Sequence, residues 1–246
     1  MSSPKKNNFP KRIQNSLKII NEVSRSMGIH HVLRVTVSYL FYKLFRSSRT
    51  FTFNGKEYKY FIHTYNPTWR KERSVEIPII KEIVRKFKGK EILEVGNVLS
   101  HYYPVNHDIL DKYEKTSKVI NQDVVSFKTQ KKYDLIVSIS TLEHVGWDEN
   151  PHEPTKILRA IKNLRKLLSP KGKIIVTLPL GYNTEMDKSI KNGKIHFDEV
   201  SYLKRTSRDN KWVETDWNGV KNVKYGHPYI CANGLLIGTI KKTATQ

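Results

Sequence analysis

Cysteine is almost absent from this sequence of 246 residues, and its scarcity excludes a whole class of proteins. A single cysteine, Cys231, can form no disulfide bond within the chain, so a small secreted scaffold held by disulfides is ruled out. A chain of this length buries enough apolar surface to fold without cross-links. We therefore expect a protein of a reducing compartment, the cytoplasm.

Long apolar stretches are missing as well. Residues 1–27 are polar and lack the apolar centre of a secretory signal. The best membrane candidate, residues 31–50, is interrupted by Arg34 and Lys43 and falls short of the roughly 20 apolar residues that cross a bilayer. This segment still predicts a helix that either lies in the surface of an anionic membrane or packs on its own domain. Its apolar residues recur at helical spacing, at Leu33, Val37, Leu40, Phe41 and Leu44.

Acidic residues are few. The sequence has 44 lysine and arginine residues against 23 aspartate and glutamate residues, which gives a net charge of +21. Residues 1–90 hold 20 of the basic residues and only 5 of the acidic ones, so the basic character belongs mainly to the N-terminal part. This charge predicts attraction to phospholipid headgroups or to nucleic acid, unless it serves only to keep the surface soluble.

The N-terminal part divides into short segments. We expect a disordered basic tail over residues 1–12, followed by a helical region to about residue 47. The alternation around Asn54-Gly55 in "RTFTFNGKEYKYFIHTY" predicts a β-hairpin. A helix follows the turn at Asn66-Pro67, and Pro78 either kinks this helix or marks its first turn.

From Lys90 onward, short apolar strands alternate with helices. Continuous apolar runs indicate strands that are buried on both faces, as in the centre of a parallel sheet. An amphipathic helix, Pro154 to Leu168, separates the two longest strands. The pattern predicts an α/β fold with a doubly wound, mostly parallel sheet. The expected strands are Glu91–Val95, Asp108–Leu110, Val119–Ile120, Leu135–Ser140 and Lys173–Leu178.

The C-terminal part follows another pattern. Strands at Trp212-Val213 and Leu235–Ile240 have no helix between them, which predicts an antiparallel pair at one edge of the sheet. We divide the chain into a basic N-terminal extension, residues 1–65, and a main domain, residues 66–246.

Glycines that would cradle a dinucleotide are lacking. The first strand, in "EILEVGNVLSHYY", ends at Gly96, and no second glycine follows. Acids nevertheless stand at the ends of neighbouring strands, where doubly wound sheets bind ligands. Asp111 is placed to accept both hydroxyls of a ribose, and Asp123 to accept an adenine amino group. The fourth strand ends in "SISTLEHVGW", which brings Glu143, His144 and Trp147 to the same rim.

These stretches together resemble the class I S-adenosylmethionine-dependent methyltransferase superfamily over residues 75–240. The most specific parts are "YDLIVSISTLEHV" and "LLSPKGKIIVTLP". The resemblance implies a seven-stranded Rossmann-like sheet with an antiparallel last strand and S-adenosylmethionine as the cofactor. It implies that Glu94 orients the loop and the methionine amino group, that Gly96 permits close backbone approach, and that Asp111 and Asp123 bind ribose and adenine. The remaining cofactor-binding candidates are Asn97, Ser100 and Ser140.

The sequence departs from the superfamily in its first loop. Val98 and Ser100 occupy places where glycine is usual, and a short "SHYYPVNH" replaces the following helix. Because S-adenosylmethionine has no pyrophosphate, one close approach at Gly96 can suffice. The alternative is a loop closed to the cofactor, which would make the chain a catalytically inactive binding module.

Methyl transfer to a hydroxyl needs a general base as well as good positioning. His144 is our candidate base, with Glu143 as its orienter or as a competing base. The histidines show no recognisable zinc spacing, so no metal ligands are assigned, although scattered carboxylates could still bind a divalent ion.

The acceptor is predicted from the residues outside the core. Methyltransferases of exocyclic amines in nucleic acids usually carry an Asn/Asp-Pro-Pro-aromatic stretch where this chain has Ser140 to Glu143, which disfavours that chemistry. The segment "TWRKERSVEIPI" is similar to segments of glycan-locus methyltransferases. We expect O-methylation of a sugar or polysaccharide hydroxyl, with an RNA or nucleic-acid methyltransferase as the less favoured alternative. The substrate-binding candidates are Trp69, Arg70, Arg73, Trp147, Tyr225 and His227.

Overall fold

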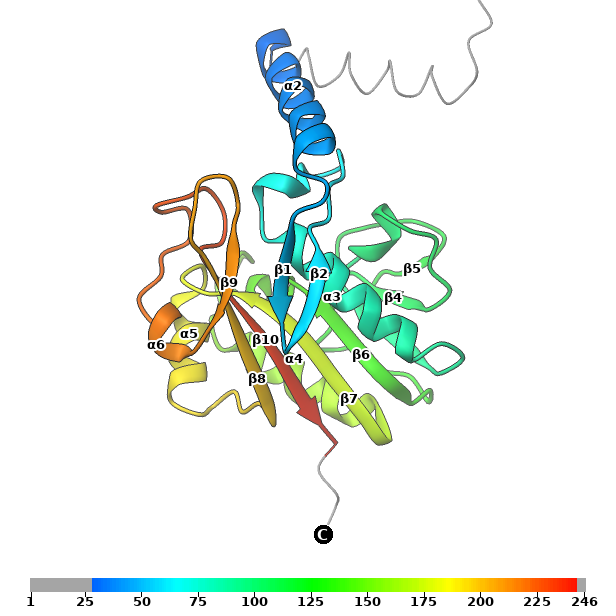
Figure 1. Cartoon of the computed structure of the whole chain (residues 1–246). Coiled ribbons are helices and arrows are strands. Elements are labelled where there is room, and N and C mark those ends of the chain that lie inside the picture. The colour runs from blue at the N-terminus through cyan, green and yellow to red at the C-terminus, as the bar shows by residue number, and fades with distance from the viewer. Residues whose placement is uncertain (1–27, 243–246) are drawn as a thin grey trace, which may run out of the picture. The chain divides into compact units, whose positions relative to one another are not determined.

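The computed structural model describes residues 28–242, and the basic tail expected over residues 1–12 lies outside this range. The chain divides into two compact units, residues 1–47 and residues 48–246. In the first unit, helix α2 spans Ile29–Phe45 (Figure 1), which confirms the helix expected from the apolar spacing. No helix within the described range is both long and apolar enough to cross a membrane.

The second unit is built on a mixed eight-stranded sheet with the strand order β5-β4-β3-β6-β7-β10-β8-β9. The five strands from β3 to β7 are parallel, which confirms the doubly wound fold class. The sheet has one strand more than the seven expected. The parallel strands are β3 (Ile92–Val95), β4 (Asp108–Leu110), β5 (Val119–Ile120), β6 (Tyr133–Ile139) and β7 (Leu168–Pro179), and the antiparallel strands are β8 (Glu199–Arg205), β9 (Trp212–Thr215) and β10 (Gly234–Lys241).

The last strands do not pair as expected. The strand containing Trp212 and the strand containing Leu235 are both present, but β8 lies between them. The expected antiparallel pair was therefore wrong. β10 pairs antiparallel with β7 on one side and with β8 on the other, and β9 forms the edge. The sequence of β8, "EVSYLKR", carries three charges in seven residues, which hides it among the surface segments.

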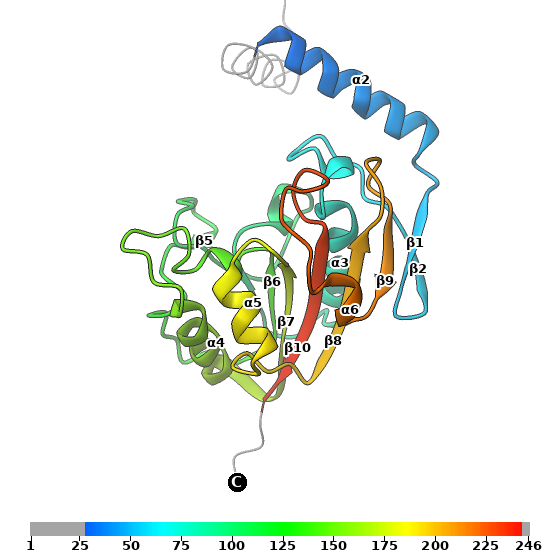
Figure 2. The ribbon, with the colours of Figure 1, turned by 90° about the vertical axis from the view of Figure 1, so that its left-hand side faces the viewer.

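Each face of the sheet is covered by its own elements, because successive strand residues point to opposite faces. Ile136 of β6 belongs to the apolar core beneath α4 (Lys156–Leu167). Its neighbour Leu135 belongs to the opposite core, beneath α3 (Arg73–Lys86). Figure 2 shows α4 and α5 on one side of the sheet and the β1–β2 hairpin on the other.

The hairpin packs on the sheet domain. β1 (Thr50–Phe53) and β2 (Lys56–Lys59) pair antiparallel around Asn54-Gly55, as expected. Phe51 and Phe53 are buried in the same core as α3, and the Asn54 amide donates to Glu214 Oε1 at 2.6 Å. The hairpin is therefore part of the second unit, and residue 65 falls inside that unit.

Helix α3 continues through Pro78. Proline has no N–H to bond the carbonyl four residues earlier, so the Ser74 carbonyl is left without its helical partner. The Phe61 amide donates to this carbonyl at 2.9 Å, which ties the segment after the hairpin to the helix.

Short turns and helices complete the fold around the carboxyl ends of the parallel strands. The loop after β3 contains only a single turn of 3-10 helix, as the short replacement segment predicted. These elements are η1 (Thr68–Arg70), η2 (Leu99–His101), η3 (Leu142–His144), α5 (Thr184–Lys191) and α6 (Trp217–Val220).

Candidate active site

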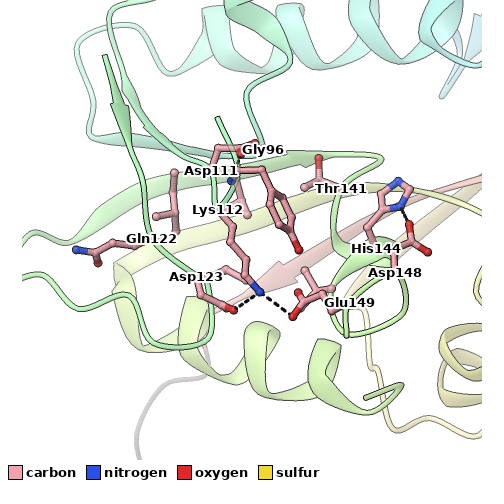
Figure 3. Close-up of a pocket in the computed structure, with 14 residues that line it drawn as sticks. Gly96, Asp111, Lys112, Gln122, Asp123, Thr141, His144, Asp148 and Glu149 are labelled. Carbon is pink, nitrogen blue, oxygen red and sulfur yellow. Dashed lines mark hydrogen bonds and ion pairs between the residues drawn. The ribbon is translucent and has the colours of Figure 1, made fainter. Parts of the chain in front are cut away.

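A cavity of about 350 Å³ lies beyond the carboxyl ends of β3, β4 and β6 (Figure 3). Its volume falls in the range of small-molecule sites, ~300–1,000 Å³. Four of the residues predicted from the sequence line it: Gly96, Asp111, Asp123 and His144. The sheet therefore brings strand ends that are far apart in the sequence to one cavity.

Asp111 connects two loops at the rim of this cavity. Its Oδ1 accepts the amides of Tyr113 and Glu114, both at 2.8 Å, and its Oδ2 accepts the amide of Asn97 at 3.2 Å. A carboxylate offers about four lone-pair sites, so these three bonds leave one acceptor position. Asp111 thus holds the first loop in place and retains one position for a ligand donor.

Gly96 occupies a position that only glycine fills without strain. Its φ of 86° lies in the left-handed region, and a β-carbon on it would lie 2.2 Å from Thr141 Oγ1. The loop after β3 can therefore approach the turn after β6 closely, and both line the cavity.

Glu94 lies beneath the first loop, fully buried and outside the lining of the cavity. Its Oε1 accepts the amides of Val98 and Leu99 at 2.9 and 2.7 Å, and its Oε2 contacts His107 Nε2 at 2.8 Å. The Glu94 carboxylate therefore fixes the conformation of this loop through hydrogen bonds, although the loop lacks the usual glycines.

Asn97 and Ser100 bond to each other instead of facing the cavity. The Asn97 side chain accepts the Ser100 hydroxyl and donates to Glu114 Oε1 at 2.7 Å. Neither residue lines the cavity, so their polar groups serve the conformation of the loop.

Two lysines and two carboxylates form a charged network along the cavity. Lys112 Nζ lies 3.1 Å from Asp123 Oδ2 and 2.8 Å from Glu149 Oε2, as Figure 3 shows, and Lys156 Nζ bonds the same two carboxylates. Burial raises the pKa of Asp123, but hydrogen bonds from Lys156, from the Val125 amide and from Lys112 outweigh it and lower the pKa to about 2. Asp123 is therefore ionised at neutral pH, and among residues 28–242 its Oδ1 accepts only the Val125 amide, at 2.9 Å.

A second cavity, of about 160 Å³, lies on the α3 side of the turn after β6. His144 lines both cavities, so the two meet at its imidazole. Four more of the predicted residues line the second cavity: Arg73, Ser140, Glu143 and Tyr225. Ser140, expected near the cofactor, therefore belongs to this second cavity.

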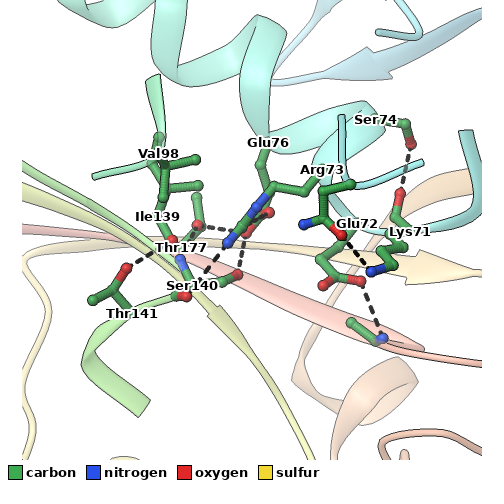
Figure 4. Close-up of polar contacts among 12 residues, drawn as sticks. Lys71, Glu72, Arg73, Ser74, Glu76, Val98, Ile139, Ser140, Thr141 and Thr177 are labelled. Atoms are coloured by element: carbon green, nitrogen blue, oxygen red, sulfur yellow. Dashed lines mark hydrogen bonds and ion pairs between the residues drawn. The ribbon is translucent and has the colours of Figure 1, made fainter. Parts of the chain in front are cut away.

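A buried polar network forms one wall of the second cavity (Figure 4). Glu76 is fully buried, and it accepts the hydroxyls of Ser140 and Thr177 and pairs with Arg73. The Arg73 guanidinium also reaches the Ser140 carbonyl at 3.5 Å. The network fixes Arg73 and the end of β6 against α3.

Glu143 has an unpaired oxygen in the same cavity. Its side chain is 1% exposed, and its Oε2 has no hydrogen-bond partner among residues 28–242. Burial raises the pKa of this carboxyl well above its ordinary value, even though the Arg73 charge opposes the shift. Its other oxygen, Oε1, lies 3.6 Å from His144 Nε2.

His144 is held from the opposite side. Its Nδ1 bonds Asp148, and Asp148 in turn accepts the Tyr182 hydroxyl at 2.6 Å. With Nδ1 engaged, Nε2 is the nitrogen that faces Glu143. A chain of four polar side chains therefore runs from Tyr182 through His144 to Glu143.

The other residues expected to bind substrate line neither of these two cavities: Trp69, Arg70, Trp147 and His227. Trp69 is 1% exposed, so its indole offers no free face for stacking. The centre of the Trp147 ring lies 4.9 Å from that of the His152 ring, and Trp147 lines neither cavity.

Sequence reasoning missed several residues of both cavities, among them Lys112, Glu149, Glu72 and Tyr182. Lys112 follows Asp111 and Glu72 precedes Arg73, so adjacency to predicted residues would have found these two. Glu149 and Tyr182 come from loops that carry no motif, and only the fold brings them in. In the described part of the chain, no group of three or more His, Cys, Asp or Glu side chains is arranged to hold a metal ion.

No protein-family model and no curated protein matches the sequence. Solved structures are similar to it at low identity. The N-methyltransferase NodS from Bradyrhizobium japonicum, in complex with S-adenosyl-L-homocysteine, is 15% identical, with 70% of this chain and 88% of that chain covered and a TM-score of 0.46. An S-adenosylmethionine-dependent methyltransferase from Clostridium acetobutylicum is 13% identical, with 84% and 97% covered and a TM-score of 0.36.

Proposed function

We propose that the chain is an S-adenosylmethionine-dependent methyltransferase whose acceptor is a hydroxyl group of a sugar or polysaccharide. The observation that carries the proposal is the pair of cavities that meet at His144. The larger cavity has Gly96, Asp111 and Asp123 on its walls, and the smaller has Arg73 and Glu143.

The residues of the larger cavity fit the adenosyl part of the cofactor. Asp111 retains an acceptor position for a ribose hydroxyl, and Asp123 Oδ1 retains one for the adenine amino group. Val95, Leu110 and Val124 supply apolar lining for a planar ring. When bound, S-adenosylmethionine supplies a methyl group on a sulfonium, and the carbon–sulfur bond breaks as a lone pair of the acceptor forms the new bond.

His144 takes the proton of the acceptor hydroxyl. Its Nδ1 proton donates to Asp148, which leaves the lone pair on Nε2 at the meeting point of the cavities. Asp148 orients the ring and stabilises the imidazolium that forms, and the Tyr182 hydroxyl fixes Asp148. A general base of this kind contributes ~10²–10⁴-fold to the rate.

Helix α2 supports contact with an anionic membrane surface. Five apolar residues recur at helical spacing and are between 46% and 70% exposed: Leu33, Val37, Leu40, Phe41 and Leu44. Residues 28–50 contain four lysine or arginine residues and no acidic residue. A basic helix with an apolar stripe lies in the plane of a membrane and binds anionic lipids. Leu40→Glu should then reduce co-sedimentation with phosphatidylglycerol vesicles, and unchanged binding would contradict this contact.

A nucleic acid is the second candidate acceptor, favoured by the 20 basic against 5 acidic residues of positions 1–90. Transfer of a labelled methyl group from S-adenosylmethionine to mono- and polysaccharides, and in parallel to RNA, distinguishes the two. We expect transfer to sugar, and transfer to RNA alone would contradict the proposal. His144→Gln should lower the rate by ~10²–10⁴-fold, whereas the control His196→Gln, outside both cavities, should not.

A further inference from the structure

The second cavity and its immediate surroundings hold more carboxyl groups than cationic groups. Glu72 and Glu143 line the cavity, and Glu76 lies directly behind Arg73. The cations are Arg73 and Lys71. Three carboxylates therefore face two cations, with the His144–Asp148 pair beside them.

The pairing of these groups leaves two carboxylates without a cation. Arg73 is taken by Glu76, and the Lys71 ammonium bonds the side-chain oxygen of Asn66. Glu72 Oε2 accepts the Ala232 amide at 3.2 Å, a neutral donor. Within residues 28–242, neither Glu72 nor Glu143 forms an ion pair with a lysine or arginine.

Glu143 adds an observation of a different kind, because one of its oxygens has no partner at all. A buried carboxyl oxygen without a partner is unfavourable, so it points to a functional role or to a partner such as water, an ion or a ligand. The side chain is 1% exposed and lines the cavity. Because Glu143 lines the cavity, a molecule that enters it can supply the missing partner.

Both carboxyls are affected by this environment. Burial raises the pKa of Glu72, and the nearby Glu76 charge raises it further. Burial raises the pKa of Glu143 as well. A cation that enters the cavity would favour the ionised forms of both carboxyls, whereas a phosphate or carboxylate would disfavour them.

We propose that the acceptor carries a protonated amine, which binds between Glu143 and Glu72, so that the substrate is an amino sugar rather than a neutral one. This inference rests on the proposed function, because it concerns the acceptor cavity of that same site. The ammonium donates to Glu143 Oε2 and to Glu72, and it brings a positive charge next to both carboxyls. The acceptor hydroxyl then lies toward His144, the residue that the two cavities share.

A neutral sugar satisfies the cavity less well. A hydroxyl can donate to Glu143 Oε2, but it brings no positive charge to the two carboxyls. An N-acetylated sugar offers an amide in place of the ammonium and adds bulk to a cavity of about 160 Å³. A site for an amino sugar should therefore prefer the free amine, whereas a general sugar site should bind all three kinds of sugar alike.

Calorimetry on the protein saturated with S-adenosylhomocysteine tests the proposal, with D-glucosamine, D-glucose and N-acetyl-D-glucosamine as matched probes at neutral pH. We expect glucosamine to bind at least about tenfold more tightly than the other two, as a charge-assisted hydrogen bond provides. Equal affinities, or no binding of glucosamine, would overturn the inference.

Glu143→Gln should abolish the selectivity, and Glu72→Gln should weaken it. Asp187→Asn is the matched control, because Asp187 also has a buried oxygen without a partner among the described residues but lines neither cavity. Thermal unfolding and binding of S-adenosylhomocysteine show that each variant folds. If the parent fails to bind S-adenosylhomocysteine, the proposed function fails. If it binds, and selectivity for glucosamine survives Glu143→Gln, only the inference fails.

Discussion

Gly96 and Thr141 pack so closely that a β-carbon on Gly96 would lie 2.2 Å from the Thr141 hydroxyl oxygen. The contact joins the loop after β3 to the turn after β6, and both residues line the larger cavity. One glycine at this point does the work that a glycine-rich loop does elsewhere, because Glu94 fixes the rest of the loop from below.

Gly96→Ala should therefore both destabilise the protein and weaken binding of S-adenosylmethionine. The left-handed φ of 86° costs a residue with a β-carbon roughly 1–2 kcal/mol, and displacement of Thr141 adds to this. Gly193→Ala is the matched control, because its φ is 71° and a β-carbon there meets nothing within 4 Å. Urea unfolding should show a larger loss for Gly96→Ala, and equal losses would contradict the close packing.

Glu76→Gln should cost about 3–5 kcal/mol of unfolding free energy, because it leaves the buried Arg73 guanidinium without its ion-pair partner. Glu82→Gln, on the same helix, is the control. Glu82 pairs with Lys56 and Lys86 near the surface, and its loss should change stability little. Similar denaturation midpoints for the two variants would contradict the assignment of Glu76 to a structural network.

The two lysines of the charged network, Lys112 and Lys156, should contribute differently to the stability of the fold. Lys112 is 37% exposed and Lys156 only 11%, although both bond Asp123 and Glu149. Lys112→Met should cost less than about 1 kcal/mol, as exposed ion pairs do, and Lys156→Met should cost more. Thermal unfolding of the two variants checks the order, and a reversed order would show that the network is not organised around Lys156.

Asp187 should make stability fall between about pH 4 and pH 6. Burial raises its pKa to about 6 from the ordinary value of 3.8, so the folded protein holds this proton more tightly than the unfolded chain does. Ionisation therefore opposes folding, and stability is lost as the pH rises through this interval. Asp187→Asn should remove the loss, on the order of 1–3 kcal/mol at pH 7, whereas the exposed Glu185→Gln should not. Parallel pH profiles for parent and Asp187→Asn would contradict this prediction.

Much of the fold could be predicted because the parallel strands are buried on both faces. β4 and β5 begin and end at the predicted residues, and Leu135 to Val137 form a continuous apolar run inside β6. β8 could not be predicted, because its charged residues resemble those of a surface loop and it lies near the edge of the sheet. That omission also caused the mispaired C-terminal strands.

The site was predictable only in part, and for a related reason. Asp111, Asp123 and His144 each follow a strand, and parallel strands end at one edge, so their meeting followed from the topology. Glu143 and Arg73 were predicted singly, but their common cavity depends on how α3 packs against the end of β6. The packing of α3 against a turn that is distant in the sequence leaves no local signal in the sequence.

If the larger cavity binds the adenosyl group, calorimetric titration with S-adenosylhomocysteine should detect the binding. The parent should bind, and Asp111→Asn should weaken the affinity by roughly 10–100-fold, the contribution of a hydrogen bond to a charged group. Glu153→Gln, which removes only an exposed ion pair, should leave it unchanged. No heat from the parent at millimolar ligand, or an unchanged affinity in Asp111→Asn, would contradict the account.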